Sequence, residues 1–209
     1  MSHLEPLDRK DLPELEELFS HYDETLSFVP NSLFTMARRP ETLRVLSDLI
    51  PVIWRTGTLP IELKPLVALV SSMAAGCRYC QAHESVDMRE RGVPEEKISD
   101  VWDFEFSPHF DEAERAVLRF ARDASVLPNA VGSGHFDDLR RFYDDGQIVE
   151  VLTVICLFGF LNRWNDTVAT ELEIDPLRYA TAIHEASDWN PGKHSCPRSG
   201  RFQLQGEVL

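Results

Sequence analysis

Apolar residues recur at helical spacing along nearly the whole chain. Leu12, Leu15 and Phe19 mark one face of a first segment, and continuous apolar runs occupy residues 66–75 and 151–161. Runs that alternate between apolar and polar residues, as a half-buried strand would, are few. The pattern therefore predicts an all-α protein in which the two apolar runs are buried helices.

Helix signals divide the central part of the chain. Gly76 interrupts the run that begins at Leu66, and "CRYCQAHESVDMRERG" resumes it up to Gly92. This places Cys77 and Cys80 in the first turn of a new helix. Further on, Asp111 and Glu114 form a capping pair ahead of a long amphipathic helix.

A weak internal repeat relates the two halves of the chain. The apolar helices align without a gap and match these pairs: Cys77 with Asn162, Cys80 with Asn165, and Pro65 with Glu150. The second half would then carry amides where the first carries thiols. We predict one helical domain over residues 1–209, with repeats at 25–105 and 106–186 and an extended tail at 187–209.

Composition narrows the classes of partner. The formal charge of −14 would repel both a nucleic-acid backbone and an anionic membrane surface. The N-terminus lacks the apolar core of a secretory signal, and the apolar runs are shorter than a bilayer requires. We expect a cytoplasmic protein that binds neither nucleic acid nor membrane, with its four cysteines in a reducing compartment.

The two thiols of the CxxC motif carry the candidate chemistry. Unpaired amides at a helix N-terminus stabilise a thiolate, and a nearby second thiol can convert a sulfenic acid to a disulfide. His83 and Glu84, three and four residues after Cys80, fall on the same helical face and could move the proton. Cys156 is expected in the core, and Cys196 is expected to have no role.

A metal site is the competing interpretation of the motif. Cys77, Cys80 and His83 are all possible zinc ligands. A second ligand pair is missing, however, and we therefore expect neither a metal nor another cofactor. A cluster at Asn162, Arg163, Asn165 and Asp166 favours a buried polar network, and it could also line a pocket beside the thiols.

The motifs resemble a known family. "GCRYCQAH" after "LVALVSSMAA" resembles the AhpD-like alkylhydroperoxidases of the carboxymuconolactone decarboxylase superfamily, and "FGFLNRWNDTVATELE" with "WNPGKH" resembles its long, two-repeat, peroxidase-related branch. The resemblance implies an all-α fold, a homo-oligomer (a dimer, trimer or hexamer), and reduction of small hydroperoxides by electrons from a dithiol protein or small thiol. It also implies that Cys80 is the peroxidatic thiol and that Cys77 is the resolving and more accessible thiol.

Two positions depart from the family pattern. The Glu that the family places twelve residues before the first Cys is Pro65 here, and its His four residues after the second Cys is Glu84. We hypothesise that the packing of the two halves brings Glu150 near Cys80 or His83 to complete the relay, with Glu62 as a second candidate.

Two other functions stay open at this point. One is lactone decarboxylation, the activity in the superfamily's name, although that branch uses no CxxC motif. The other is a non-enzymatic helical oligomer that senses redox state or is stabilised by zinc.

Overall fold

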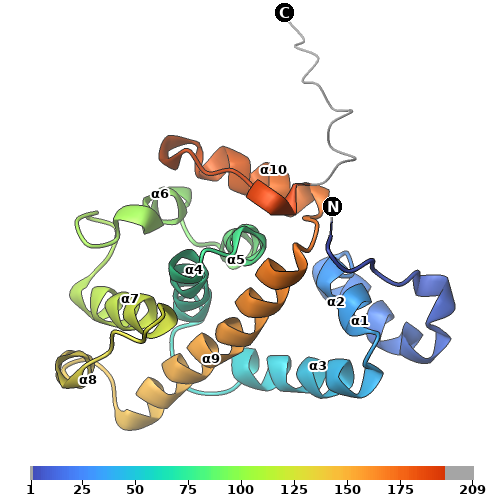
Figure 1. Ribbon diagram of the computed structural model, residues 1–209. Coiled ribbons are helices and arrows are strands. Elements are labelled where there is room, and N and C mark those ends of the chain that lie inside the picture. The colour runs from blue at the N-terminus through green and yellow to red at the C-terminus, as the bar shows by residue number, and fades with distance from the viewer. Residues whose placement is uncertain (1, 196–209) are drawn as a thin grey trace, which may run out of the picture.

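The computed structural model describes residues 2–195, and every regular element within them is helical (Figure 1). The all-α prediction is therefore confirmed. The α-helices are, in chain order, α1 (Glu16–Leu26), α2 (Asn31–Met36), α3 (Pro40–Arg55), α4 (Leu63–Ala75), α5 (Arg78–Glu90), α6 (Glu95–Ser99), α7 (Glu112–Ser125), α8 (Ser133–Leu139), α9 (Asp145–Val168) and α10 (Ile174–Ile183). Short 3-10 turns join them at Arg9–Asp11, Pro13–Leu15, Asp100–Asp103, Glu185–Ser187 and Gly192–His194.

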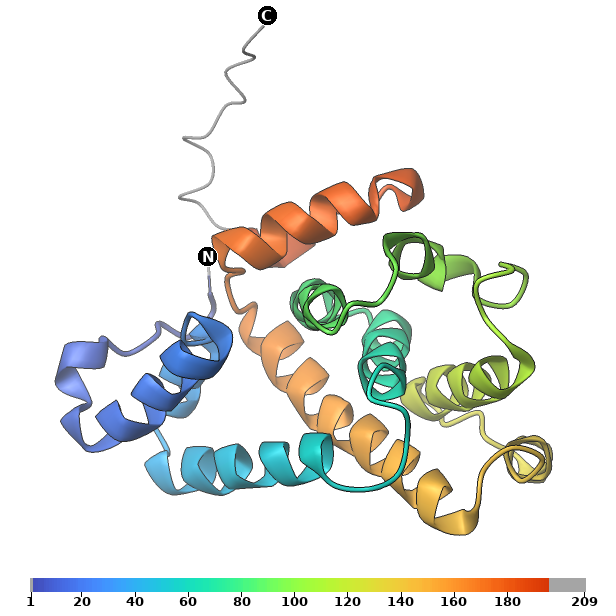
Figure 2. The same ribbon diagram turned by 180° about the vertical axis from the view of Figure 1, so that it is seen from behind.

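Helix α4 forms the centre of the fold. It contacts α5, α7 and α9, and its buried side chains run almost without a break from Leu63 to Ser72. Figures 1 and 2 show α1, α2 and α3 on one side of the diagonal α9, and α6, α7 and α8 on the other. The predicted capping pair is present, since Asp111 and Glu114 form a complete capping box at the start of α7.

The chain turns sharply between α4 and α5. Gly76 adopts a left-handed conformation (φ 76°) as the cap of α4, and Cys77 is extended as the N-cap of α5. The predicted helix break is therefore present. At Leu161, which the proposed repeat aligns with Gly76, α9 continues without interruption, so the halves differ here and the duplication stays a prediction.

Helix α9 exposes one apolar face. Val149, Leu152 and Phe160 are solvent-exposed along it, and Cys156 lies on the same face. The expectation that Cys156 is a core residue is wrong, because the helix buries only the opposite stripe. By length and composition α9 could cross a membrane, but a helix through the middle of a globular fold passes the same test.

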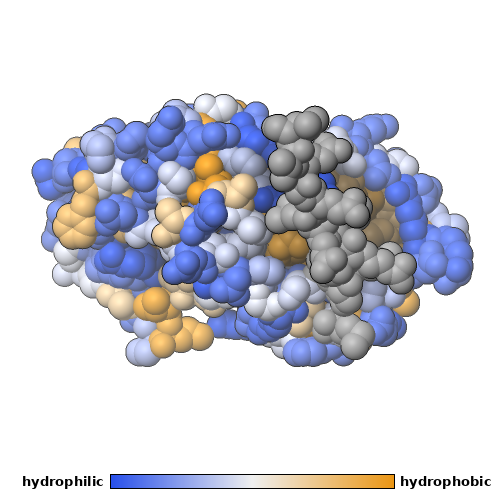
Figure 3. All heavy atoms as spheres, turned by 90° about the horizontal axis from the view of Figure 1, so that it is seen from above, coloured by the Kyte–Doolittle hydropathy of each residue, from blue (hydrophilic) through white to orange (hydrophobic). Residues whose placement is uncertain are grey.

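The first part of the predicted extended tail is folded. The Trp189 indole is buried and donates a hydrogen bond to the Gln81 side chain at 2.9 Å, and the Leu172 amide donates to the His194 carbonyl at 3.0 Å. Residues 187–195 therefore lie over α5 rather than extending away from it. Cys196 lies outside the described residues. The face on the α10 side is largely hydrophilic, in keeping with the acidic composition (Figure 3).

Candidate functional site

The two thiols of the CxxC motif lie at the amino end of α5. Cys77 is the N-cap residue and Cys80 follows in the first turn, as predicted, and both are free thiols. Cys77 is 0% exposed and Cys80 is 4% exposed. The expectation that Cys77 is the more accessible thiol is therefore wrong.

Cys77 is paired with a histidine from the end of the chain. The Nδ1 atom of His194 lies 2.7 Å from the Thr170 carbonyl, which assigns the proton to Nδ1. Its Nε2 atom lies 3.6 Å from the Asp166 carboxylate and makes no hydrogen bond of ordinary geometry to the described residues, and the ring acts on the nearby Cys77 thiol through its effect on the pKa. The hydrogen bond from Cys80 and then the pairing with His194 lower the pKa of Cys77 to about 6, although burial opposes the shift. Contact with Cys77 and Thr170 raises the pKa of His194 in spite of its burial.

The pKa of Cys80 shifts in the opposite direction to that of Cys77. Burial, followed by the neighbouring Cys77, raises the pKa of the Cys80 thiol, and the Asn165 amide donates to its sulfur at 3.5 Å. The two thiols are coupled, so they share one proton over a wide pH range. At neutral pH the pair holds a single negative charge, centred on Cys77, with the proton on Cys80.

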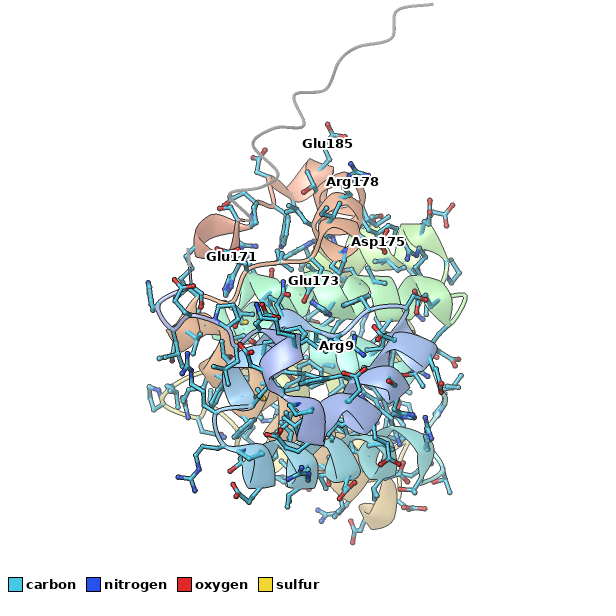
Figure 4. The ribbon with its side chains drawn as sticks, turned by 90° about the vertical axis from the view of Figure 1, so that its right-hand side faces the viewer. Arg9, Glu171, Glu173, Asp175, Arg178 and Glu185 are labelled. Carbon is cyan, nitrogen blue, oxygen red and sulfur yellow. The ribbon has the colours of Figure 1, made fainter. Side chains whose placement is uncertain are left out.

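His83 does not pair with a thiol as the spacing suggested. Its Nε2 atom lies 2.7 Å from the Glu173 carboxylate, and its ring stacks on Tyr79 with the centroids 4.4 Å apart. The Tyr79 hydroxyl and the Asn31 amide donate to the same carboxylate at 2.8 and 2.5 Å. Figure 4 shows Glu173 below α10, on the linker from α9.

The Glu173 carboxylate connects α2, α5 and the linker before α10, since Asn31, Tyr79 and His83 all contact it. Burial opposes its ionisation, but the charge of His83 and the hydrogen bonds from His83 and the Asn31 amide bring the pKa of the carboxyl below its usual value. A buried carboxylate with this set of donors is fully satisfied. His83 therefore has a structural partner and is not free to act as the base for Cys80 in this arrangement.

Glu84 is the unusual member of the predicted set. It is 8% exposed, its Oε2 atom has no hydrogen-bond partner, and burial followed by the nearby Asp87 raises the pKa of its carboxyl well above the usual value. Glu84 follows Cys80 by one turn of α5, so the two side chains are neighbours. The raised pKa favours the protonated form of this carboxyl, which lies beside the thiols.

A cleft of about 1260 Å³ has His83 and Glu84 among its lining residues. It lies between α1 and α3 on one side and α5 on the other. Its apolar lining includes Leu18, Tyr22, Phe28, Ile50, Trp54 and Leu59.

Glu150 takes a different place from the one hypothesised. Its carboxylate accepts hydrogen bonds from the Thr58 and Leu59 amides at 2.8 and 3.3 Å, and it lies 3.6 Å from the Lys64 ammonium. It also fills the space that a side chain at Gly57 would need. Glu150 therefore holds the loop between α3 and α4 instead of pairing with Cys80 or His83.

The second relay candidate is also remote from the chemistry. Glu62 is exposed at the start of α4, and Pro65 is buried in the first turn of that helix. Pro65 and Glu84 occupy the two positions that differ from the family pattern, and of these only Glu84 lies beside the thiols.

Sequence reasoning missed His194 and Glu173. Both are distant in sequence from Cys77 and Cys80, so helical spacing could not connect them. The signals were "WNPGKH", which ends at His194, and "FGFLNRWNDTVATELE", which ends at Glu173, and both were noted for their resemblance alone. Within residues 2–195, no cluster of three His, Cys, Asp or Glu side chains is arranged to hold a metal ion.

The His194 pairing predicts a measurable change in thiol acidity. His194→Asn keeps an amide that can donate to the Thr170 carbonyl but removes Nε2, so the pKa of Cys77 should rise by roughly one unit or more. The ultraviolet absorbance of the thiolate, followed against pH, gives the midpoint, and Cys77→Ser identifies the transition. An unchanged midpoint in His194→Asn would show that the histidine does not stabilise the thiolate.

Comparison with known proteins gives consistent matches. Residues 40–123 match the model of the carboxymuconolactone decarboxylase family. A cysteine-to-alanine variant of the debrominase Bmp8, in complex with 2,3,4-tribromopyrrole, superposes with a TM-score of 0.81 and 34% identity over 88% of this chain and 98% of that one.

Two further proteins are more distant or match over less of their length. An AhpD-core, peroxidase-related protein from Ralstonia eutropha JMP134 superposes with a TM-score of 0.75 and 20% identity, over 84% of this chain and 94% of that one. The uncharacterized protein YnjA of Escherichia coli K12 is 31% identical over 54% of this chain and 65% of its own length. The chain therefore carries a segment of the carboxymuconolactone decarboxylase family at residues 40–123, and its all-α fold is that of the AhpD-core protein.

Proposed function

We propose that the protein is a thiol-dependent reductase of small hydroperoxides that works through the Cys77 and Cys80 dithiol. The observation that carries the proposal is the shared proton of the pair, with the pKa of Cys77 lowered to about 6 by Cys80 and His194. A dithiol that is singly ionised at neutral pH, at a helix N-terminus, is poised for two-electron chemistry.

The reaction proceeds in two steps. Cys80, which retains slight exposure and adjoins Glu84, attacks the terminal oxygen of the hydroperoxide while its proton passes to the Cys77 thiolate. The O–O bond breaks, Cys80 becomes a sulfenic acid, and the alkoxide takes a proton and leaves as an alcohol.

Cys77 then closes the disulfide. It attacks the Cys80 sulfur, the S–O bond breaks, and the proton of Cys77 reaches the departing hydroxide through His194, so that water leaves. The overall change converts one hydroperoxide and two thiols to one alcohol, one water and one disulfide. A dithiol donor, either a partner protein or a small thiol, returns the pair to the reduced state.

One experiment tests this order of reaction steps directly. Reduced protein mixed with one equivalent of cumene hydroperoxide, without a donor, should lose two thiols and yield a peptide containing the Cys77 and Cys80 disulfide by mass spectrometry. Added dithiothreitol should then support repeated turnover. Recovery of both thiols intact after exposure to the hydroperoxide would refute the proposal.

A second candidate is reductive dehalogenation, favoured by the 34% identity to the debrominase Bmp8 over nearly the whole of both chains. There, a thiolate would take bromine from a brominated ring, the ring would take a proton, and the second thiol would displace bromide to form the same disulfide. Bromide release from 2,3,4-tribromopyrrole with dithiothreitol as the donor distinguishes the two candidates. Release without hydroperoxide turnover would favour the dehalogenase.

A further inference from the structure

Glu84 is a buried acid for which the fold supplies no partner. Its side chain is more than nine-tenths buried, and its Oε2 atom makes no hydrogen bond in the described structure. A buried polar atom in a native protein is normally paired, so an unpaired one indicates a group that serves a ligand. Glu84 also lines the cleft, which gives such a ligand access to it.

A second unpaired group lies close to the same point. Asn162 is 3% exposed, and neither its amide nitrogen nor its amide oxygen has a hydrogen-bond partner. It precedes Asn165, the residue that contacts Cys80, by one turn of α9, as Glu84 follows Cys80 by one turn of α5. Both unpaired side chains therefore lie within one helical turn of the contact between Cys80 and Asn165.

The cleft favours an uncharged organic molecule. Aromatic side chains line its middle, among them Tyr22, Phe28 and Trp54. Apart from Glu84, the charged side chains that line the cleft nearly balance. The acids are Glu14, Glu17, Asp48, Asp87 and Glu90, and the cations are Arg44, Arg55, Lys64 and Arg91. The cleft therefore offers little net charge to attract an ion, whereas an apolar neutral molecule would bury its surface against the aromatic rings.

We infer that Glu84, which lines this cleft and follows Cys80 by one helical turn, is the general acid for an uncharged organic hydroperoxide that reaches Cys80 from the cleft. This inference rests on the proposed function. It adds a catalytic residue, because Glu84 would contact the reacting atoms, and it assigns the substrate class.

The proton transfer completes the first step of the reaction. As Cys80 takes the terminal oxygen and the O–O bond breaks, the Glu84 carboxyl gives its proton to the alkoxide, which leaves as an alcohol. The resulting carboxylate recovers a proton from water in the cleft before the next turnover. Protonation of a strongly basic leaving group by a positioned acid contributes about 10²- to 10⁴-fold to a rate.

The test compares two oxidants that differ in leaving group. Cumene hydroperoxide releases a strongly basic alkoxide that needs a proton, whereas a peroxycarboxylic acid releases a weakly basic carboxylate that does not. In Glu84→Gln, the rate of thiol loss with cumene hydroperoxide should fall by roughly 10²-fold or more, with little change for the peroxycarboxylic acid. Glu96→Gln, which changes an exposed acid of α6 that is not among the cleft residues, is the control and should react like wild type with both.

The outcomes separate the inference from the proposed function. An equal loss with both oxidants would make Glu84 a structural residue, and no loss with either would remove it from the mechanism, so each result overturns the inference alone. If wild type reacts with neither oxidant, the proposed function fails and the inference fails with it. Thermal melting of Glu84→Gln and Glu96→Gln shows whether any loss reflects misfolding.

Discussion

Cys80→Ser should lower hydroperoxide turnover by roughly 10³-fold or more, because the thiol that attacks oxygen cannot be replaced by a hydroxyl of much higher pKa. Cys77→Ser should also stop turnover, but with a different chemical outcome. With the attacking thiol intact and the resolving thiol absent, Cys80 should accumulate as a sulfenic acid. Turnover with dithiothreitol and dimedone labelling followed by mass spectrometry measure the two effects.

The chain provides its own matched control for these variants. Cys156 is an exposed thiol on α9, away from the contacts of Cys77 and Cys80, and Cys156→Ser should turn over like wild type. A dimedone adduct on Cys77 in the Cys80→Ser variant, with turnover retained, would reverse the roles of the two thiols. Equal turnover in wild type and in both single variants would exclude dithiol chemistry altogether.

The local part of this site could be predicted from the sequence. The break at Gly76 and the placement of Cys77 and Cys80 at a helix start follow from backbone preferences that act over a few residues, and the structure contains both. The one-turn spacing of Cys80 and Glu84 follows from the same helix.

The partners of these residues could not be predicted in the same way. The thiol was expected to pair with His83, yet the ring binds Glu173, 90 residues away in sequence. Cys77 takes His194 from a segment that was expected to be extended. A histidine on a helix face has several possible partners of equal spacing, and tertiary packing alone decides among them.

Glu150 illustrates the limit of the repeat argument. The alignment placed it at the position equivalent to Pro65, but equivalence of position does not fix the direction or partners of a side chain. The amides of Thr58 and Leu59, in the loop after α3, donate to the carboxylate, and the Lys64 ammonium of α4 lies 3.6 Å from it. The donors around Glu150 therefore determine its partners, and the alignment of the two halves does not predict them.

Glu173→Ala should lower the free energy of unfolding by roughly 3 to 5 kcal/mol, because it leaves a buried His83 and two other donors without an acceptor. Glu173→Gln keeps an acceptor oxygen and should lose less. Urea unfolding followed by circular dichroism measures both. Asp175→Asn is the control, since its carboxylate contacts Arg89 at an exposed site and should contribute little.

The Glu173 carboxylate should also make the difference in unfolding free energy between wild type and Glu173→Gln depend on pH. Because the folded protein holds the pKa of Glu173 below the usual 4.5, its charge stabilises the fold fully at neutral pH, and this contribution is lost as the pH falls below that value through the folded pKa. The stability gap between wild type and Glu173→Gln should therefore narrow in acid. A gap that is constant from neutral to acidic pH would mean that the hydrogen bonds of Glu173, and not its charge, hold α2, α5 and the linker before α10 together.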